Sequence, residues 1–186
     1  CAIFRDGVAR CWGSNRMGLV GNRAVDAAGD TLFPVPVSGS LSLIALATSK
    51  SNSALGGPTC GLTAGGTIHC WGPMPAGELG SAAADACTDL GITLACARDP
   101  VPVSAGLTFA TLDVGSRVRA ANAPGRPRVC AVSVSGDAYC WGDNASGALG
   151  DGTITSRSTP TRIGASEKWI DISKASLDVA VHGDPK

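Results

Sequence analysis

Apolar residues occur along this chain in short segments that either alternate with polar residues or run continuously for part of their length. Three such segments begin at Leu41, Phe109 and Trp169 and read LSLIALATS, FATLDVGSR and WIDISKASL. Clusters of Gly, Pro, Asn and Asp separate the segments, a pattern typical of β-strands joined by turns and not of helices. No apolar run approaches the length of a membrane span. We therefore expect an all-β fold of short strands.

One sequence template occurs three times. It consists of a cysteine, nine further residues and CWG, and it reads CAIFRDGVARCWG from Cys1, CGLTAGGTIHCWG from Cys60 and CAVSVSGDAYCWG from Cys130. Each copy continues with a Gly-containing motif, a proline segment (PVPV at Pro34, PVPV at Pro100, PTRI at Pro160) and one of the apolar segments above. Each repeat therefore predicts four short strands, which is the size of a β-propeller blade, with insertions between some of the strands.

The middle of each template predicts a hairpin turn. A three-residue loop centred there puts Gly7, Gly66 and Gly136 at the position where a type I turn with a G1 bulge requires a positive φ. Counting outward from the turn places the two cysteines of each template directly opposite each other.

All eight cysteines fall into neighbouring pairs, with a fourth pair inside an insertion. We predict four disulfides: Cys1–Cys11, Cys60–Cys70, Cys87–Cys96 and Cys130–Cys140. Buried free thiols are the main alternative, because no pair has the close spacing of common zinc ligands. Disulfides indicate an oxidising compartment, so we expect a secreted protein that is extracellular or on the cell surface.

The CWG motif, followed by DNASGALGDG and a proline segment in the third copy, resembles the regulator of chromosome condensation repeat. The first copy has LVG where QLG is usual, and the second has PMPA in place of the Asn segment. The resemblance implies a β-propeller, commonly of seven blades, that binds proteins through its loop faces, and together with the cysteines it implies a secreted bacterial-type member. It assigns no functional residue, because the matching positions are structural.

The repeats predict one domain over the whole chain. Its expected parts are repeats at about 1–48, 49–115 and 116–175, a partial repeat at 176–186 and a disulfide-closed insertion at 81–99. The chain would hold about three and a half blades of four antiparallel strands. Further sequence or a second copy would complete such a partial propeller, because open blade faces and edges need cover. Trp12, Trp71 and Trp141 are expected to pack against neighbouring blades, and Trp169 to lie in register with Leu41 and Phe109.

Composition and motifs exclude several kinds of function. The 15 basic and 15 acidic residues give a formal net charge of zero, so we expect neither a nucleic-acid partner nor binding to an anionic membrane. Because no apolar run is long enough to span a membrane, we expect no membrane insertion either. Only His69 and His182 could serve as imidazole bases, and His69 lies inside a predicted strand. Asp143, Asn144, Ser146 and Asp151 lack the spacing of a calcium loop and are expected to stabilise a turn. We expect no catalytic residue, no cofactor and no metal.

Successive antiparallel strands put alternate connections at opposite ends of a blade. The hairpin turns share one end, while the insertions at 49–59, 81–99 and 116–129 share the other. The last insertion carries Arg117, Arg119, Arg126 and Arg128 and no acidic residue, so these are candidate partner-binding residues, with a solvated basic loop as the alternative. We expect a non-catalytic module that binds or scaffolds a protein partner or self-assembles. A glycan-binding propeller or a subunit of a surface adhesin or filament is the alternative.

Overall fold

The computed structural model describes residues 1–25, 29–49, 56–75, 77, 85–103, 106–117 and 126–172. Its elements are β1 (Ala2–Ile3), β2 (Ala9–Ser14), η1 (Arg16–Gly18), β3 (Asp30–Pro36), β4 (Leu43–Thr48), β5 (Thr59–Thr63), β6 (Ile68–Pro73), β7 (Asp85–Asp89), β8 (Ile92–Val103), β9 (Asp113–Arg117), β10 (Arg126–Val132), β11 (Ala138–Gly142) and β12 (Arg157–Ile163). No helix in the described ranges is long and apolar enough to cross a membrane.

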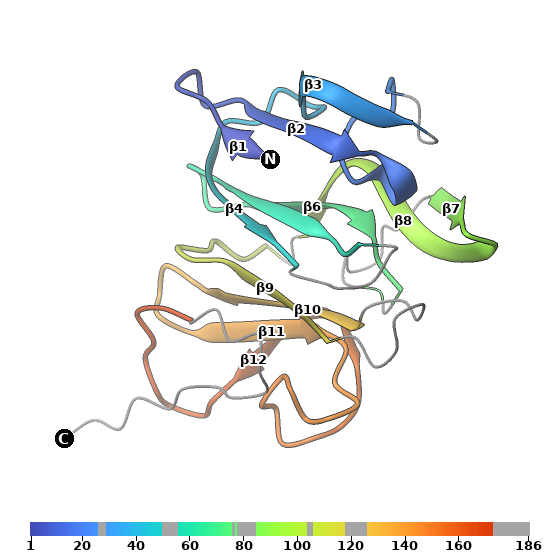
Figure 1. Cartoon of the computed structure of the whole chain (residues 1–186). Helices are drawn as coiled ribbons and strands as arrows, with labels where there is room; N and C mark the ends of the chain where they lie inside the picture. Colours follow the sequence, from blue (N-terminus) through green and yellow to red (C-terminus); the bar gives the residue numbers. More distant parts are fainter. Residues whose placement is uncertain are drawn as a thin grey trace.

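The strands form three antiparallel sheets stacked one on the next (Figure 1). Their strand orders are β1-β2-β3, β4-β5-β6-β8-β7 and β9-β10-β11-β12. The all-β architecture of propeller blades is therefore confirmed, with one difference in detail. Only the third sheet has four strands, because β7 adds a fifth to the second sheet and the first sheet contains three. Most of the predicted fourth half-blade, from residue 173, lies outside the described residues.

The sequence repeat and the sheet are out of phase. The apolar segment that closes one repeat forms the first strand of the next sheet, since β4 pairs with β5 and β9 with β10. A backbone N–H from each of these segments bonds to the glycine carbonyl of the preceding hairpin turn: Leu43 to Gly7 (3.1 Å), Phe109 to Gly66 (2.9 Å) and Trp169 to Gly136 (2.8 Å). Leu43, and not Leu41, is therefore equivalent to Phe109. The predicted register was wrong by two residues.

The three template hairpins form as predicted. Gly7, Gly66 and Gly136 have φ of 76°, 80° and 82°. Cys60 lies opposite Cys70 and Cys130 opposite Cys140 in the strand ladders. The Cα atoms of the bonded cysteines in these hairpins are 4.0, 4.0 and 4.2 Å apart, as expected at positions where an antiparallel pair makes no backbone hydrogen bonds and the strands come closest. With Cys87–Cys96 as the fourth, all predicted disulfides are present.

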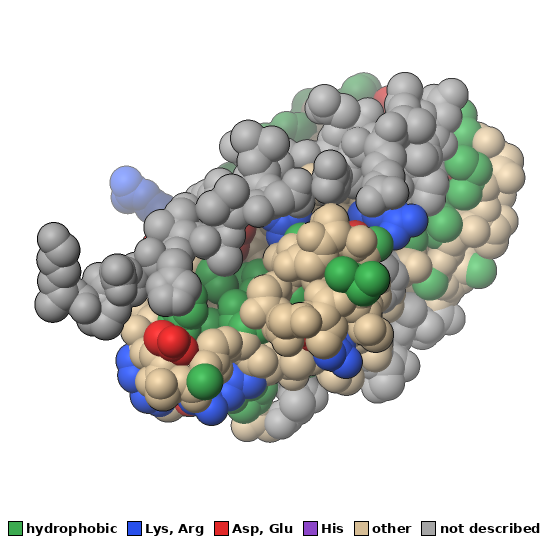
Figure 2. Space-filling model, turned by 90° about the horizontal axis from the view of Figure 1, so that it is seen from below, with side chains coloured by type: hydrophobic (Ala, Val, Ile, Leu, Met, Phe, Trp, Pro, Cys, Tyr) green, Lys and Arg blue, Asp and Glu red, His purple; other side chains and the backbone are tan. Residues whose placement is uncertain are grey.

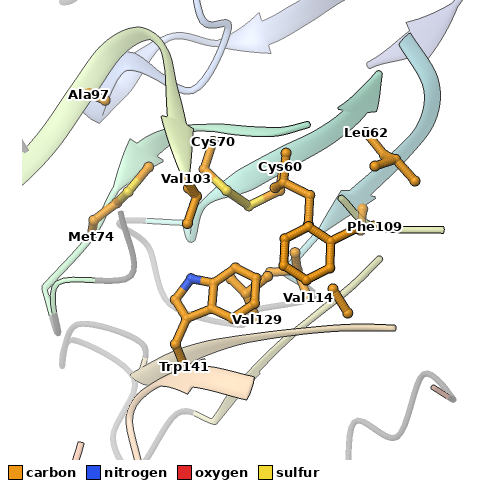
Figure 3. Packing of buried hydrophobic residues seen from close by; sticks show 13 residues of the cluster. Cys60, Leu62, Cys70, Met74, Ala97, Val103, Phe109, Val114, Val129 and Trp141 are labelled. Atoms are coloured by element: carbon orange, nitrogen blue, oxygen red, sulfur yellow. A yellow bond between two sulfur atoms is a disulfide. The ribbon is translucent and has the colours of Figure 1, made fainter. Parts of the chain in front are cut away.

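The core lies between the sheets. Trp141 of β11 and Phe109 pack against Cys60, Cys70 and Val103 of the second sheet (Figure 3). Trp71 of β6 packs in the same way against the first sheet. Both indoles are 0% exposed, whereas Trp12 of β2 is 47% exposed. The expectation that all three CWG tryptophans pack against a neighbouring blade was therefore wrong for Trp12, because among the described residues no sheet lies on that side of β2.

Candidate functional site

The end of the blades opposite the hairpin turns carries the longer connections. The β2–β3 connection with η1, the β7–β8 hairpin and the β11–β12 connection all lie at this end, because each follows a strand that runs in the same direction. We call it the insertion-rich end. Its described parts include Arg126 and the cysteine pair of the insertion at 81–99, of which residues 85–99 are described.

The insertion forms a β-ribbon that is continuous with the second sheet. β7 pairs with the first half of β8, from Asp89 opposite Ile92 to Asp85 opposite Cys96. The second half of β8 pairs with β6. The ribbon turns at Leu90 and Gly91, whose φ values of 50° and 75° are those of a two-residue turn that twists with its strands. Leu90 is 60% exposed at this tip, so the ribbon presents an apolar side chain in a conformation that costs a leucine energy.

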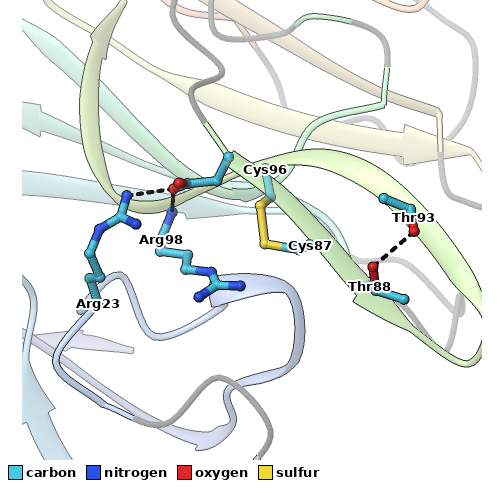
Figure 4. The surroundings of a disulfide bond; sticks show 7 residues. Arg23, Cys87, Thr88, Thr93, Cys96 and Arg98 are labelled. Carbon is cyan, nitrogen blue, oxygen red and sulfur yellow. Dashed lines mark hydrogen bonds and ion pairs between the residues drawn. A yellow bond between two sulfur atoms is a disulfide. The ribbon is translucent and has the colours of Figure 1, made fainter.

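The base of the ribbon is packed onto the first sheet. Cys87 and Cys96 are buried with Met17 of η1, and Ile92 and Leu94 pack against this cluster. Figure 4 shows the disulfide where the ribbon leaves the sheet. A disulfide at this position limits opening of the hairpin in both the folded and the unfolded chain.

Ion pairs at the surface also hold the base of the ribbon against the first sheet. The Arg23 guanidinium donates to Asp85 (Nη2 to Oδ2, 2.6 Å), the dashed line at Arg23 in Figure 4. It also donates to Asp99 (Nε to Oδ2, 2.9 Å). The hydrogen bond from Arg23 lowers the pKa of Asp85. Burial would raise the pKa of Asp99, but hydrogen bonds from Arg23 and Ser38 outweigh it and lower that pKa. We call residues 85–99, with Met17 and Arg23, the clasp, because they fasten the second sheet to the first.

The sequence pointed to the insertion but missed the clasp. Asp85 and Asp99 lie close to the cysteine pair, a signal that charge surrounds it, but Arg23 is 62 residues from Asp85. Nothing local in the sequence connects them. The base of the ribbon therefore fastens the second sheet to the first, and only the tip of the ribbon projects.

The predicted arginines are partly placed. Arg126 is half exposed at the start of β10, and its Nη1 donates to Asp143 Oδ1 at 2.9 Å. Arg117 lies opposite Arg126 in the ladder between β9 and β10. The guanidinium of Arg128 lies beside Gly115, and Arg119 lies outside the described residues. The structure thus brings Arg117 and Arg126 onto adjacent strands at the insertion-rich end.

The β11–β12 connection is organised by buried polar groups. Asn144 is buried, its Nδ2 donates to the carbonyl oxygens of Thr153 and Thr155, and its Oδ1 accepts from Leu149 N. Burial would raise the pKa of Asp151, but hydrogen bonds from Thr153, Arg157 and Asn144 lower it to about 2. These groups are occupied in holding the loop, in line with the expected turn-stabilising role.

Within the described part of the chain, His69 is not paired with an acidic side chain. It lies in β6 opposite Gly61 and Pro102, and burial lowers its pKa. Its Nδ1 is buried and has no hydrogen-bond partner among the described residues. His182 lies outside the described residues.

Comparison with known proteins adds the family of the repeat. A family model for the regulator of chromosome condensation (RCC1) repeat matches residues 135–176. A comparison with curated protein sequences found no match.

Two solved structures have a similar fold. The chain is similar to yeast RCC1 (Prp20) in its crystal structure with Kap60, with a TM-score of 0.68, 20% identity and coverage of 89% of this chain and 35% of that one. It is also similar to Prp20p from Saccharomyces cerevisiae, whose report covers its binding to Gsp1p and histones, with a TM-score of 0.66, 19% identity and coverage of 89% and 36%.

The chain spans about a third of the length of these proteins. At such identities the likeness establishes the fold. Residues 135–176 therefore match the regulator of chromosome condensation repeat, and the chain has the blade architecture of the β-propellers built from such repeats.

Proposed function

We propose that this chain is part of an extracellular, non-catalytic β-propeller that binds another protein through its insertion-rich end. The observation that carries the proposal is the braced ribbon, which holds an exposed apolar tip on a base fixed by a disulfide, a buried cluster and ion pairs. A rigid segment loses less conformational entropy on binding than a free loop, so it suits a recognition element.

The chemistry of this end favours a protein as the partner. Leu90 offers an apolar anchor, and Arg126 offers a half-exposed guanidinium on the same end of the blades. Such apolar and arginine side chains are characteristic of protein interfaces. Arg117, Arg119 and Arg128 remain proposed contacts in the same segment.

The disulfides and the similar solved structures support the proposed extracellular, protein-binding role less directly. The four disulfides favour an oxidising, extracellular location. Both similar structures are of yeast Prp20, which is bound to Kap60 in one of them and whose binding to Gsp1p and histones was studied with the other. The division into repeats at 1–48, 49–115 and 116–175, with a partial repeat at 176–186, remains part of the proposal.

The test is site-specific photocrosslinking. A benzoylphenylalanine replaces Leu90 in one preparation and Val134 in another, and each is irradiated with extracellular proteins of the source organism. Val134 is a matched control, because it is exposed and apolar but lies in a hairpin turn at the opposite end. We expect a protein crosslinked at position 90 and not at 134.

Affinity measurements with the captured protein complete the test. Leu90→Asn removes the apolar tip while asparagine tolerates the positive φ, and we expect it to weaken binding about tenfold or more, as loss of an interface anchor does. Arg126→Gln should also weaken binding, and Val134→Asn should leave it unchanged. Equal capture at both positions, or a glycan ligand with no protein bound, would contradict the proposal.

A further inference from the structure

The third repeat contains the acceptor pattern for Asn-linked glycans. Asn144, Ala145 and Ser146 form Asn-x-Ser, in which x is not proline. A glycan is bulky and polar, so the acceptor asparagine of a folded secreted protein belongs on the surface. Ala145 and Ser146 are exposed, but Asn144 is 0% exposed. The pattern therefore conflicts with the position of its asparagine.

Both ends of the Asn144 amide are used inside the β11–β12 connection. Nδ2 donates to Asp151 Oδ1 (3.0 Å) and to the carbonyl oxygens of Thr153 (3.0 Å) and Thr155 (3.1 Å). Oδ1 accepts from Leu149 N (2.9 Å). An amide NH2 group has two hydrogens, and acceptors surround them here. The connection is therefore folded around this amide.

The connection itself lies at the surface. In Figure 1 it loops out, in orange, below the third sheet. Figure 2 views the molecule from this side, where backbone and uncharged polar side chains, in tan, cover much of the described surface. Asn144 is therefore covered by the loop to which it belongs.

Glycosylation would change this amide. In the transfer a C–N bond forms between the first sugar and Nδ2, the C–O bond of that sugar to its lipid-linked pyrophosphate donor breaks, and Nδ2 loses one proton. One N–H would remain among the acceptors, which leaves buried oxygens without a donor. The sugar would also have to occupy space that the packed connection fills. A glycosylated Asn144 therefore cannot take its folded position, and a folded Asn144 cannot reach a transferase.

The groups that enclose Asn144 come later in the chain. Its acceptors at Asp151, Thr153 and Thr155 lie between it and β12, and Arg157 of β12 fixes Asp151 (Nε to Oδ2, 2.8 Å). N-terminal parts of a chain are made and fold first. The acceptor pattern is therefore open to a transferase until β12 has been made and has paired.

We propose that Asn144 is a glycan acceptor only in the unfolded chain, and that a glycan there excludes the folded β11–β12 connection. The chain accordingly completes its fold in a compartment that forms disulfides but does not attach Asn-linked glycans. This narrows the extracellular location in the proposed function. It concerns folding alone and does not depend on partner binding at the insertion-rich end.

The test compares secretion of the full chain, behind a secretion signal, from a eukaryotic cell line that attaches Asn-linked glycans. Ser146→Ala removes the pattern and keeps Asn144, and the contacts above do not use the exposed Ser146 side chain. We expect the unmodified chain to carry a glycan at Asn144, detected by mass, and to be retained. The Ser146→Ala chain should form its four disulfides and reach the medium in several-fold larger amount, because cells remove unfolded chains.

Ser146→Ala combined with Ile154→Asn is the matched control. The second change creates Asn-Thr-Ser at position 154 of the same connection, where Ile154 is 74% exposed. We expect this chain to be glycosylated and still secreted in folded form. The control thus separates the position of a glycan from its presence.

Export to the periplasm of a bacterium without such a transferase separates the glycan from the substitutions. There the unmodified chain and both variants should give equal amounts of folded protein. The inference would be overturned if the eukaryotic cells secreted the unmodified chain in folded form, with or without a glycan at Asn144. Equal retention of the unmodified and Ser146→Ala chains would also overturn it. Neither result involves Leu90, so a failure of the proposed partner binding would leave this test unaffected.

Discussion

Gly66 shows how a single residue meets two requirements of the blade. Its φ of 80° belongs to the hairpin turn, and its Cβ position lies 2.5 Å from Thr108 Cγ2 and 3.1 Å from Phe109 N. The turn therefore needs glycine both for its own conformation and because the segment that leads into β9 crosses it. Its carbonyl accepts the hydrogen bond from Phe109 that joins the two sheets.

These two requirements can be separated by mutation. Gly66→Ala should lower the free energy of unfolding by about 2–4 kcal/mol. The added methyl group would strain the turn at its positive φ and would also overlap the neighbouring segment. Gly91→Ala should cost only about 1 kcal/mol, because its φ is 75° but no described residue lies within 4 Å of its Cβ position. Urea unfolding of both variants measures the difference, and equal losses would mean that the turn conformation alone explains Gly66.

At the scale of elements, the β7–β8 ribbon adds a further contact between the first two sheets, beside their shared core and the hydrogen bond from Leu43 N to the Gly7 carbonyl. Half of β8 belongs to the second sheet, and the other half carries the clasp onto η1 and Arg23 of the first. The insertion between two strands of the second sheet therefore also helps to hold that sheet against the first. The exposed tip is the part for which we propose a role in recognition.

The clasp should make the free energy of unfolding depend on pH when the pH is lower than the ordinary pKa of a carboxyl group. The pKa values of Asp85 and Asp99 are lowered in the folded protein, so their contribution is complete above about pH 4 and is lost as the pH falls through the lowered values. Arg23→Gln removes the cation that both carboxylates contact. At pH 7 we expect Arg23→Gln to lower the free energy of unfolding only slightly, because the side chains are partly exposed. As the pH falls below about 4, the variant should lose less stability than the unmodified protein does.

Thermal unfolding at a series of pH values measures this effect. Arg5→Gln makes the same charge change in an exposed hairpin turn at the opposite end of the blades, so it serves as the control. The interpretation would fail if Arg5→Gln and Arg23→Gln gave the same pH profile.

At the scale of the whole molecule, the stacking of sheets decides what each repeat contributes. The same CWG motif gives two buried indoles and one that is 47% exposed. Trp141→Ala should therefore cost about 3–5 kcal/mol, as removal of a large buried side chain does. Trp12→Ala should cost much less, because about half of the Trp12 surface is already exposed. Unfolding in guanidinium chloride compares the two variants, and an equal loss for Trp12→Ala would show that Trp12 is covered in solution.

Much of the fold could be predicted because it depends on residues close together in the sequence. The hairpins follow from the spacing of each cysteine pair around its glycine, since turn geometry and the alternation of side chains fix the pairing over a few residues. The four disulfides follow from the same local geometry or, for Cys87–Cys96, from proximity. The register of β4 was missed by two residues because it is set by a contact with another part of the chain, the hydrogen bond from Leu43 N to the Gly7 carbonyl, and not by the apolar pattern of the segment itself.

The sequence by itself determined the strands, the hairpins, the cysteine pairs and the repeat, because each is set by neighbours along the chain. Only the tertiary structure decided that Arg23 meets Asp85, that the ribbon is a brace at its base, and that Trp12 is exposed while Trp71 is buried. These features depend on which surfaces come together when sheets stack. Identical motifs therefore acquire different roles according to the neighbour that each one has.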